Sequence, residues 1–225
     1  MNKRLIVPLI FGIGGFAILI GLGNWQMRRL AWKNAVIAEI DRRIAEAPVA
    51  VPADPVPDKD RYRPVTFAGR PTGKEVHVLT SIEGEGAGYR VIAAIEEDSG
   101  RRLLVELGFL RQADKSTAAT TMPITGTGNI HWPDEVDGFT PEPDLDSNIW
   151  FARDVPAIAQ ALDAEPFLIV SSSLTGTSRD LTAMPVKSSA IKNDHLEYAL
   201  TWYLLAAVWA GMTGYLVWRI RREKM

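Results

Sequence analysis

Two long apolar segments lie at the ends of the chain, with a polar region between them. Residues 5–23 and 198–218 contain no charged side chain over 19 and 21 positions. A bilayer core of about 30 Å is crossed by about 20 residues of α-helix, so each segment is long enough to span it. The pattern predicts a membrane α-helical hairpin of two transmembrane helices that bears one extramembrane domain.

Apolar side chains recur at helical spacing beyond the first segment. The residues that share this face are Leu30, Ile37, Ile40 and Ile44. Their spacing predicts that the helix continues toward Pro48. Residues 48–60 then contain four prolines and three aspartates, a composition typical of an extended linker.

Short runs of β-branched and aromatic residues follow, separated by glycine and charged clusters. We expect strands at residues 63–69, 75–79, 89–95, 102–110, 126–132 and 167–171. The cluster from Asp98 to Gly100 predicts a hairpin turn. A short helix is expected over residues 154–162, with Asp154 as N-cap and Pro156 in the first turn. The hairpin therefore carries a mostly-β (α+β) extramembrane domain.

These elements divide the chain into four parts. We expect an N-terminal tail with transmembrane helix 1 (1–25), a juxtamembrane helix with a proline-rich linker (26–60), an external β-rich domain (61–192), and transmembrane helix 2 with a basic tail (193–225).

The charged residues are distributed unevenly, although the formal net charge is only -2. The two tails carry six bases and one acid, a charge of +5, which leaves -7 on the rest. Short basic termini favour the cytoplasmic side, which predicts a multi-pass membrane protein with both termini cytoplasmic and the main domain on the outer side. The first segment exceeds a usual signal-peptide core and lacks a small-x-small site before Arg28, so we expect an uncleaved anchor.

The amino-acid composition excludes several kinds of functional site. The chain has no cysteine, which excludes disulfides, thiolate metal sites and a cysteine nucleophile. A net charge near zero argues against general nucleic-acid binding. Residues 133–147, the acidic loop, contain six acids and no base. Their spacing does not match a calcium loop, so we interpret them as a solvated loop that could dock a basic partner.

Few side chains suit catalysis. His77 and His131 have no metal-ligand spacing, and we expect a surface or hydrogen-bonded structural role for each. Residues 171–173 and 175–178 indicate a flexible hydroxyl-rich loop and no activated nucleophile. No metalloprotease or nucleophile-elbow motif occurs in the sequence, so we expect no enzyme.

His195 differs because it lies just before the second apolar segment, where a membrane would meet water. If the helix starts there, the residues expected on its face are Ala199, Trp202, Ala206 and Ala210, with Gly214 at the edge. The first segment offers Gly14, Ala17 and Gly21, so we expect these small-residue rows to pack together. An imidazole at the end of such a seam suits an axial haem ligand, but a histidine at a membrane interface is usually a plain anchor, and the residues alone favour the anchor.

Two motifs at the ends of the chain carry a family likeness. The sequence LGNWQMRRLAWK at Leu22–Lys33 resembles the first-span exit of the surfeit-one (SURF-one) family of cytochrome c oxidase assembly factors. The sequence NDHLEYALTWYLLA at Asn193–Ala206 resembles the family's second-span entry. Weaker matches follow in the expected order at Gly88–Ile95, Leu103–Leu110 and Asn148–Leu162, so the resemblance covers nearly the whole chain.

The sequence departs from the family pattern at two places. Asp194 and Glu197 replace amide residues beside the histidine, and residues 106–109, Glu-Leu-Gly-Phe, replace a typical Asn-Arg-Gly-Trp. The matching residues are His195, Trp25, Gln26, Tyr198 and Trp202.

The resemblance implies a protein that binds haem a transiently and aids its insertion into cytochrome c oxidase subunit I, with haem a synthase as a possible second partner. It implies that His195 is the axial ligand of the haem iron, that Trp25 and Trp202 flank the macrocycle, and that Gln26 and Tyr198 belong to the same site. The alternative is a cofactor-free membrane scaffold that stabilises an oxidase assembly intermediate. A membrane sensor is disfavoured because only residues 219–225 follow the second segment.

Overall fold

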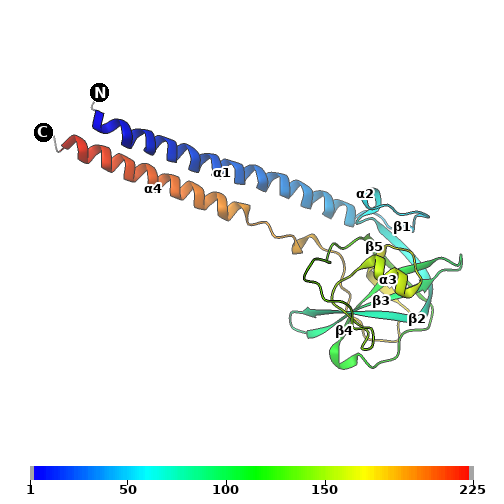
Figure 1. The fold of residues 1–225 in the computed structure, drawn as a ribbon. Coiled ribbons are helices and arrows are strands. Elements are labelled where there is room, and N and C mark those ends of the chain that lie inside the picture. The colour runs from blue at the N-terminus through cyan, green and yellow to red at the C-terminus, as the bar shows by residue number, and fades with distance from the viewer. Residues whose placement is uncertain (1–2, 223–225) are drawn as a thin grey trace. The chain divides into compact units, whose positions relative to one another are not determined.

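The computed structural model describes residues 3–222, which form two compact units. Residues 3–39 and 188–222 make up the helical unit, and residues 40–187 make up the β unit. Each unit is described by itself below (Figure 1).

Two antiparallel helices form the helical unit (Figure 1). Helix α1 covers Lys3–Ile44, of which the part up to Glu39 belongs here, and helix α4 covers His195–Arg222, preceded by the single turn η2 at Ser188–Ala190. Both helices are long and apolar enough to cross a membrane, which with the β unit confirms the predicted fold class. The continuation of the first helix to a point before Pro48 is also confirmed.

The helices pack along faces that repeat every seven residues. The buried or half-buried positions of α1 include Leu5, Gly12, Leu19, Gln26 and Lys33. Those of α4 include Ala199, Ala206, Thr213 and Ile220. A seven-residue repeat over two helical turns is the packing pattern of a coiled coil. We call the contact between these two faces the seam.

The expectation for the small residues in the seam is partly wrong. Ala199 and Ala206 are buried as expected, but the other small residues named in advance are exposed: Gly14, Ala17, Gly21, Ala210 and Gly214. The α4 row Ala206–Ala210–Gly214 has four-residue spacing, so it turns about 400° per step and moves about 40° away from the seam each time. In α1, Gly14 and Gly21 share the seven-residue repeat but lie two residues, about 200° around the helix, from the seam positions Gly12 and Leu19.

Different glycines allow the close approach of α1 to α4. A Cβ added to Gly12, Gly15 or Gly23 would lie 2.2–2.5 Å from the side chains of Thr213, Trp209 and Tyr203, respectively. The seam therefore places large side chains of α4 over glycines of α1. The indole Nε1 of Trp209 also donates to the carbonyl of Gly12 at 3.0 Å.

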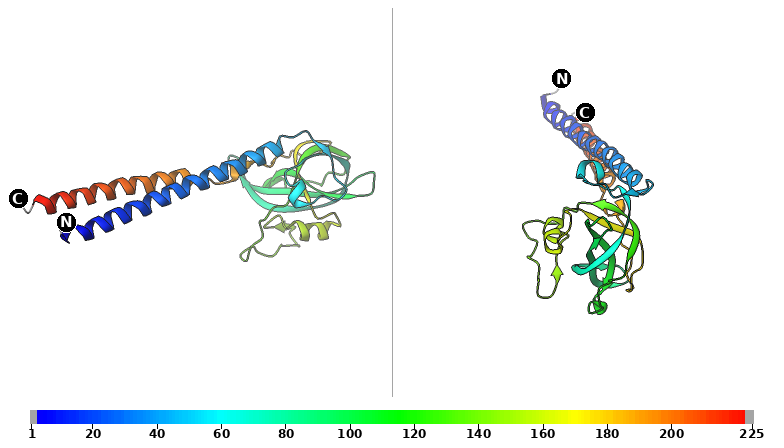
Figure 2. Two further views of the ribbon diagram at one scale, coloured as in Figure 1. Left: turned by 90° about the horizontal axis from the view of Figure 1, so that it is seen from above. Right: turned by 90° about the vertical axis from the view of Figure 1, so that its right-hand side faces the viewer.

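A closed five-stranded barrel forms the β unit (Figure 2). Its strands, in order around the wall, are β2 (Pro64–Ile82), β3 (Gly86–Glu96), β4 (Arg102–Arg111), β7 (Leu168–Thr175) and β5 (Ile124–His131). All neighbours are antiparallel except β4 and β7. The expected strands at residues 63–69 and 75–79 are one long strand, because β2 carries an irregularity between Pro71 and Glu75 and pairs first with β5 and then with β3.

Two apolar layers explain why apolar and polar residues do not alternate along the central strands. One cluster fills the barrel and includes Phe67, Val91 and Ile169. A second cluster lies between the barrel wall and helix α3 (Val155–Leu162), and it includes Ile92 and Ile158. Strands β3 and β4 are buried on both faces, so their sequences are nearly continuous apolar runs. The hairpin between them confirms the turn predicted at residues 98–100.

The local predictions at α3 are confirmed. The Asp154 side chain accepts from the backbone N–H of Ala157 at 3.1 Å, and Pro156 lies in the first turn. The helix ends at Asp163, which adopts the left-handed conformation.

Two expectations for loop regions are wrong. Residues 48–60 contain strand β1 (Val49–Ala50) and the single-turn helix α2 (Pro57–Asp60) instead of a purely extended linker. Residues 171–173 belong to strand β7, because their backbone pairs with β5 in the barrel wall. The remaining elements are the turn η1 (Gln112–Asp114) and the short strand β6 (Ile149–Trp150), which pairs with β2.

Candidate functional site

One hydrogen bond joins the two helices at the level of His195. The imidazole Nδ1 of His195 lies 2.7 Å from the amide Oε1 of Gln26, and these residues are 169 positions apart in sequence. Gln26 is one of the seam positions of α1 and is 9% exposed. His195 is the first residue of α4 and is half-buried. The structure therefore brings together two of the five residues expected at the site.

Polar contacts bracket this pair along the seam. On one side, the Tyr203 hydroxyl donates to Oδ1 of Asn24 at 2.8 Å. On the other side, Nδ2 of Asn193 donates to Oδ1 of Asn34 at 2.7 Å. The ammonium group of Lys33 also donates to the backbone carbonyl of Lys192. These contacts fix the facing of α1 and α4 in the stretch that holds Gln26 and His195.

The three aromatic residues expected at the site are less enclosed. Trp202 is half-buried on the same side of α4 as Ala199 and Ala206. Trp25 is 49% exposed and Tyr198 is 57% exposed, so neither lies inside the seam. Their rings are free to contact a molecule that rests against the outside of the helix pair.

The Gln26 contact determines which ring nitrogen of His195 can act as a ligand. An amide oxygen only accepts, so Nδ1 of a neutral imidazole must carry the proton and Nε2 must carry the lone pair. Within residues 3–222, no hydrogen bond is made to Nε2 of His195. A neutral imidazole with a free nitrogen is the form that binds haem iron, so the residues present fit this group.

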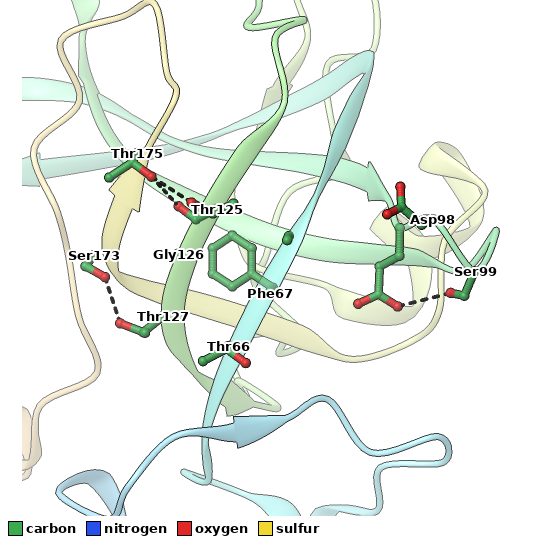
Figure 3. A pocket seen from close by; sticks show the side chains of 11 residues that line it. Thr66, Phe67, Asp98, Ser99, Thr125, Gly126, Thr127, Ser173 and Thr175 are labelled. Atoms are coloured by element: carbon green, nitrogen blue, oxygen red, sulfur yellow. Dashed lines mark hydrogen bonds between the residues drawn. The ribbon is translucent and has the colours of Figure 1, made fainter.

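The β unit holds a groove lined with hydroxyl groups, with a volume of ≈ 720 Å³ (Figure 3). Its walls come from β2, β5 and β7 and from the turn after β3. The hydroxyls of Thr125 and Thr175 lie 2.8 Å apart, and so do those of Thr127 and Ser173. The hydroxyls therefore pair with one another across the strands, as is common in sheets, and form no nucleophile–base arrangement.

Charged groups form a chain beside α3 in the β unit. The carboxylate of Glu106, 1% exposed, accepts from Arg90 and, at 3.1 Å, from Arg153. Arg153 also binds Glu135 of the acidic loop through its backbone N–H and its guanidinium. Burial would raise the pKa of Glu135, but the hydrogen bonds and charge of Arg153 outweigh it and hold this pKa below its usual value.

A second buried cluster contains His77, whose predicted structural role is confirmed. Its Nε2 lies 2.9 Å from Glu75, and Arg179 binds the same carboxylate with two hydrogen bonds of 2.8 and 2.6 Å. Burial would raise the pKa of Glu75, but hydrogen bonds from His77 and Arg179 outweigh it and lower the pKa. This cluster ties the segment after β7 to strand β2.

His131 stacks on Tyr62, with ring centroids 5.4 Å apart, and its buried Nδ1 has no hydrogen-bond partner among the described residues. The expected structural role thus rests on stacking and not on a hydrogen bond. Burial, and then the charges of Arg153 and Arg61, lower its pKa from 6.5 to about 4.

His131 is expected to make the β unit sensitive to acid. The unfolded chain binds the proton with a pKa near 6.5 and the folded chain with a pKa of about 4, so stability is lost as the pH falls through this window. We expect a loss of about 2 kcal/mol between about pH 6.5 and pH 4.5. Urea unfolding of the full chain in detergent, followed by tryptophan fluorescence, measures it. His131→Phe keeps a ring on Tyr62 and should flatten the dependence; equal slopes in both proteins would contradict the assignment.

In residues 3–222, no group of three or more histidine or carboxylate side chains is arranged to hold a metal ion. His77 and His131 lie in the β unit and are engaged as described above. Sequence reasoning missed the Glu106–Arg153–Glu135 chain, because its members lie on three segments whose proximity depends on barrel closure.

The fold and this site define a class: a two-helix membrane protein with a small β-barrel and an imidazole–amide pair at one end of its helix seam. The chain belongs to the SURF1 family, whose sequence model matches residues 14–207. It is 30% identical over 210 residues to human "Surfeit locus protein 1", covering 83% of this chain and 70% of that protein. The mouse protein of the same name is 28% identical over 213 residues, covering 85% and 69%. A "SURF1-like protein" of Rickettsia bellii is 28% identical over 203 residues, covering 85% and 83%.

Proposed function

We propose that this chain is an assembly factor for a haem-a-containing cytochrome c oxidase. It binds haem a transiently at the Gln26–His195 end of the helix seam and aids insertion of the haem into subunit I. Membership of the SURF1 family supports the oxidase connection. The observation that carries the haem site is the 2.7 Å contact between Nδ1 of His195 and Oε1 of Gln26, which places the lone pair of a neutral imidazole on Nε2.

When bound, the haem supplies an iron that accepts a nitrogen ligand and a flat apolar macrocycle. His195 would supply the axial nitrogen, Gln26 would hold the imidazole, and Trp202 would pack against the macrocycle. Trp25 and Tyr198, both exposed, would cover its outer side. A single protein histidine gives weaker attachment than a pair of histidines, and weak attachment suits a carrier that must release its cargo.

The same proposal includes an orientation in the membrane. The basic residues at the end of α4, Arg219, Arg221 and Arg222, favour a cytoplasmic location for both termini. The β unit and the His195 end of α4 then lie on the periplasmic side of a bacterial inner membrane.

The test is retention of haem a by the purified full chain. The protein is produced in cells that make haem a, purified in detergent and examined by its visible spectrum. We expect His195→Ala to weaken binding by more than about 100-fold, because loss of a ligand costs more than the roughly 10–100-fold loss from disturbing its partner. Tyr215→Phe, which changes an exposed tyrosine of the same helix away from Gln26 and His195, should retain the haem. Equal retention by His195→Ala and the parent would overturn the ligand assignment.

One observation favours the cofactor-free scaffold as a second candidate. The acidic loop is fastened to Arg153 through Glu135, yet it presents Phe139 at 95% and Leu145 at 70% exposure. Apolar side chains on a fixed loop are typical anchors for a protein partner. The scaffold predicts normal haem content of the oxidase with His195→Ala, but failure of oxidase assembly when Phe139 and Leu145 are changed to serine.

A further inference from the structure

The geometry around His195 gives Gln26 a role of its own. Gln26 is buried in the seam, and its carboxamide oxygen faces Nδ1 of His195 at 2.7 Å. The Asn24–Tyr203 and Asn34–Asn193 contacts lie on either side of it. The pair is therefore held by α1 and α4 together, and the imidazole is oriented before any ligand arrives.

We propose that Gln26 is a positioning residue that keeps His195 in the Nδ1–H tautomer. We propose further that Gln26 makes the imidazole a weaker iron ligand than a carboxylate partner would. This inference rests on the proposed function, in which His195 binds haem iron. A free imidazole distributes its proton between both nitrogens, whereas an acceptor at Nδ1 commits the lone pair to Nε2. The ring then needs neither a proton shift nor a rotation when the iron binds.

The choice of an amide adds a second consequence. Histidine ligands are often paired with a carboxylate, which draws the Nδ1 proton strongly and makes the nitrogen a stronger donor to the metal. The neutral oxygen of Gln26 orients the ring in the same way but polarises it less, because hydrogen bonds to charged acceptors are roughly twice as strong. A carboxylate here would therefore be expected to slow release of the haem.

Two substitutions separate positioning from packing. Gln26→Met has a similar shape but no acceptor, so a packing role would tolerate it. Gln26→Glu keeps an acceptor but buries a charge, so a packing role would tolerate it less. Positioning predicts the opposite order: Gln26→Met loses the tautomer and Gln26→Glu keeps it.

The first measurement needs no haem. The full chain is labelled with ¹⁵N-histidine in detergent, and its three histidines are assigned by comparison with His195→Ala. We expect His195 to carry its proton on Nδ1 in the parent and in Gln26→Glu, and a mixture of tautomers in Gln26→Met. A proton on Nε2 in the parent, or an unchanged Nδ1–H form in Gln26→Met, would overturn the positioning role.

The second measurement titrates haem a into the same proteins. Gln26→Met should bind about 10–100-fold more weakly than the parent, since this is the usual cost of losing a ligand's partner. Gln26→Glu should bind haem at least as tightly as the parent and should release it more slowly. Equal release rates for Gln26→Glu and the parent would refute the moderating role. Haem binding that survives in His195→Ala would instead refute the proposed function. The tautomer measurement would still show whether Gln26 sets the tautomer of His195.

Discussion

Replacing Arg153 with methionine is expected to lower the free energy of unfolding of the β unit by about 3 kcal/mol. Arg153 is 12% exposed and lies between two carboxylates, with Glu106 at 3.1 Å and Glu135 on its other side. Without it, the buried Glu106 keeps only its contact with Arg90. A buried carboxylate that loses one of two cationic partners bears much of its desolvation cost uncompensated. Urea unfolding of the detergent-solubilised chain measures the change.

Arg102 provides a matched control for this prediction. It too joins two carboxylates, Glu96 and Asp163, but its side chain is 40% exposed. Arg102→Met should therefore destabilise the β unit much less than Arg153→Met does, because solvent screens an exposed ion pair. The double variant Arg153→Met/Glu106→Gln should regain part of the loss, because the buried charge is gone. A double variant as unstable as the sum of its single changes would mean that Arg153 acts through packing and not through charge.

The same substitution should also affect the acidic loop. Glu135 has backbone and side-chain contacts to Arg153 that fasten the loop to the start of α3. Loss of these contacts should increase proteolytic cleavage of residues 133–147 at a pH where the barrel is still folded. If the loop docks a partner through Phe139, the variant should weaken docking before it unfolds the barrel.

The strands could be predicted from sequence because their composition is local information. Branched and aromatic residues at 89–95 and 102–110 indicated strands β3 and β4 with nearly correct bounds. Closure of the barrel could not be predicted, because it depends on one strand, β2, pairing with β5 through residues 64–69 and with β3 through residues 70–71 and 75–82. The two halves of that strand look independent in sequence, since the irregularity between Pro71 and Glu75 interrupts their alternation.

At the candidate site, the sequence predicted that His195 and Gln26 lie close together, but it did not predict how they meet. His195 and Gln26 were expected at one end of a helix seam, and the structure joins them by a hydrogen bond. The orientation of Trp25 and Tyr198 could not be foreseen, because a shift of one residue rotates a side chain by about 100° around the helix. Gln26 lies on the seven-residue repeat of α1, and Trp25 therefore points away from it.

The glycines of the first helix supply the sharpest comparison of seam and non-seam positions. A Cβ at Gly23 would lie 2.5 Å from the ring of Tyr203, whereas nothing lies within 4 Å of a Cβ at Gly21. Both substitutions to valine change intrinsic helix propensity equally, so any difference between them reports packing. The ring of Tyr203 cannot turn aside freely, because its hydroxyl is bonded to Asn24.

Gly23→Val is therefore expected to separate α1 from α4 at the level of the Gln26–His195 pair. Overpacking of this kind costs about 1–3 kcal/mol, and near the site it should lower haem a affinity by about 10-fold or more. Gly21→Val should leave affinity and the His195 tautomer unchanged. Haem titration and ¹⁵N-histidine spectra of the full chain in detergent measure both effects. Equal losses in the two variants would mean that the helices do not pack through Gly23. If only Gly23→Val shows a mixture of His195 tautomers, then close packing of the seam determines which ring nitrogen carries the proton. The reason is that only a close pair of helices keeps Gln26 within hydrogen-bond distance of the imidazole.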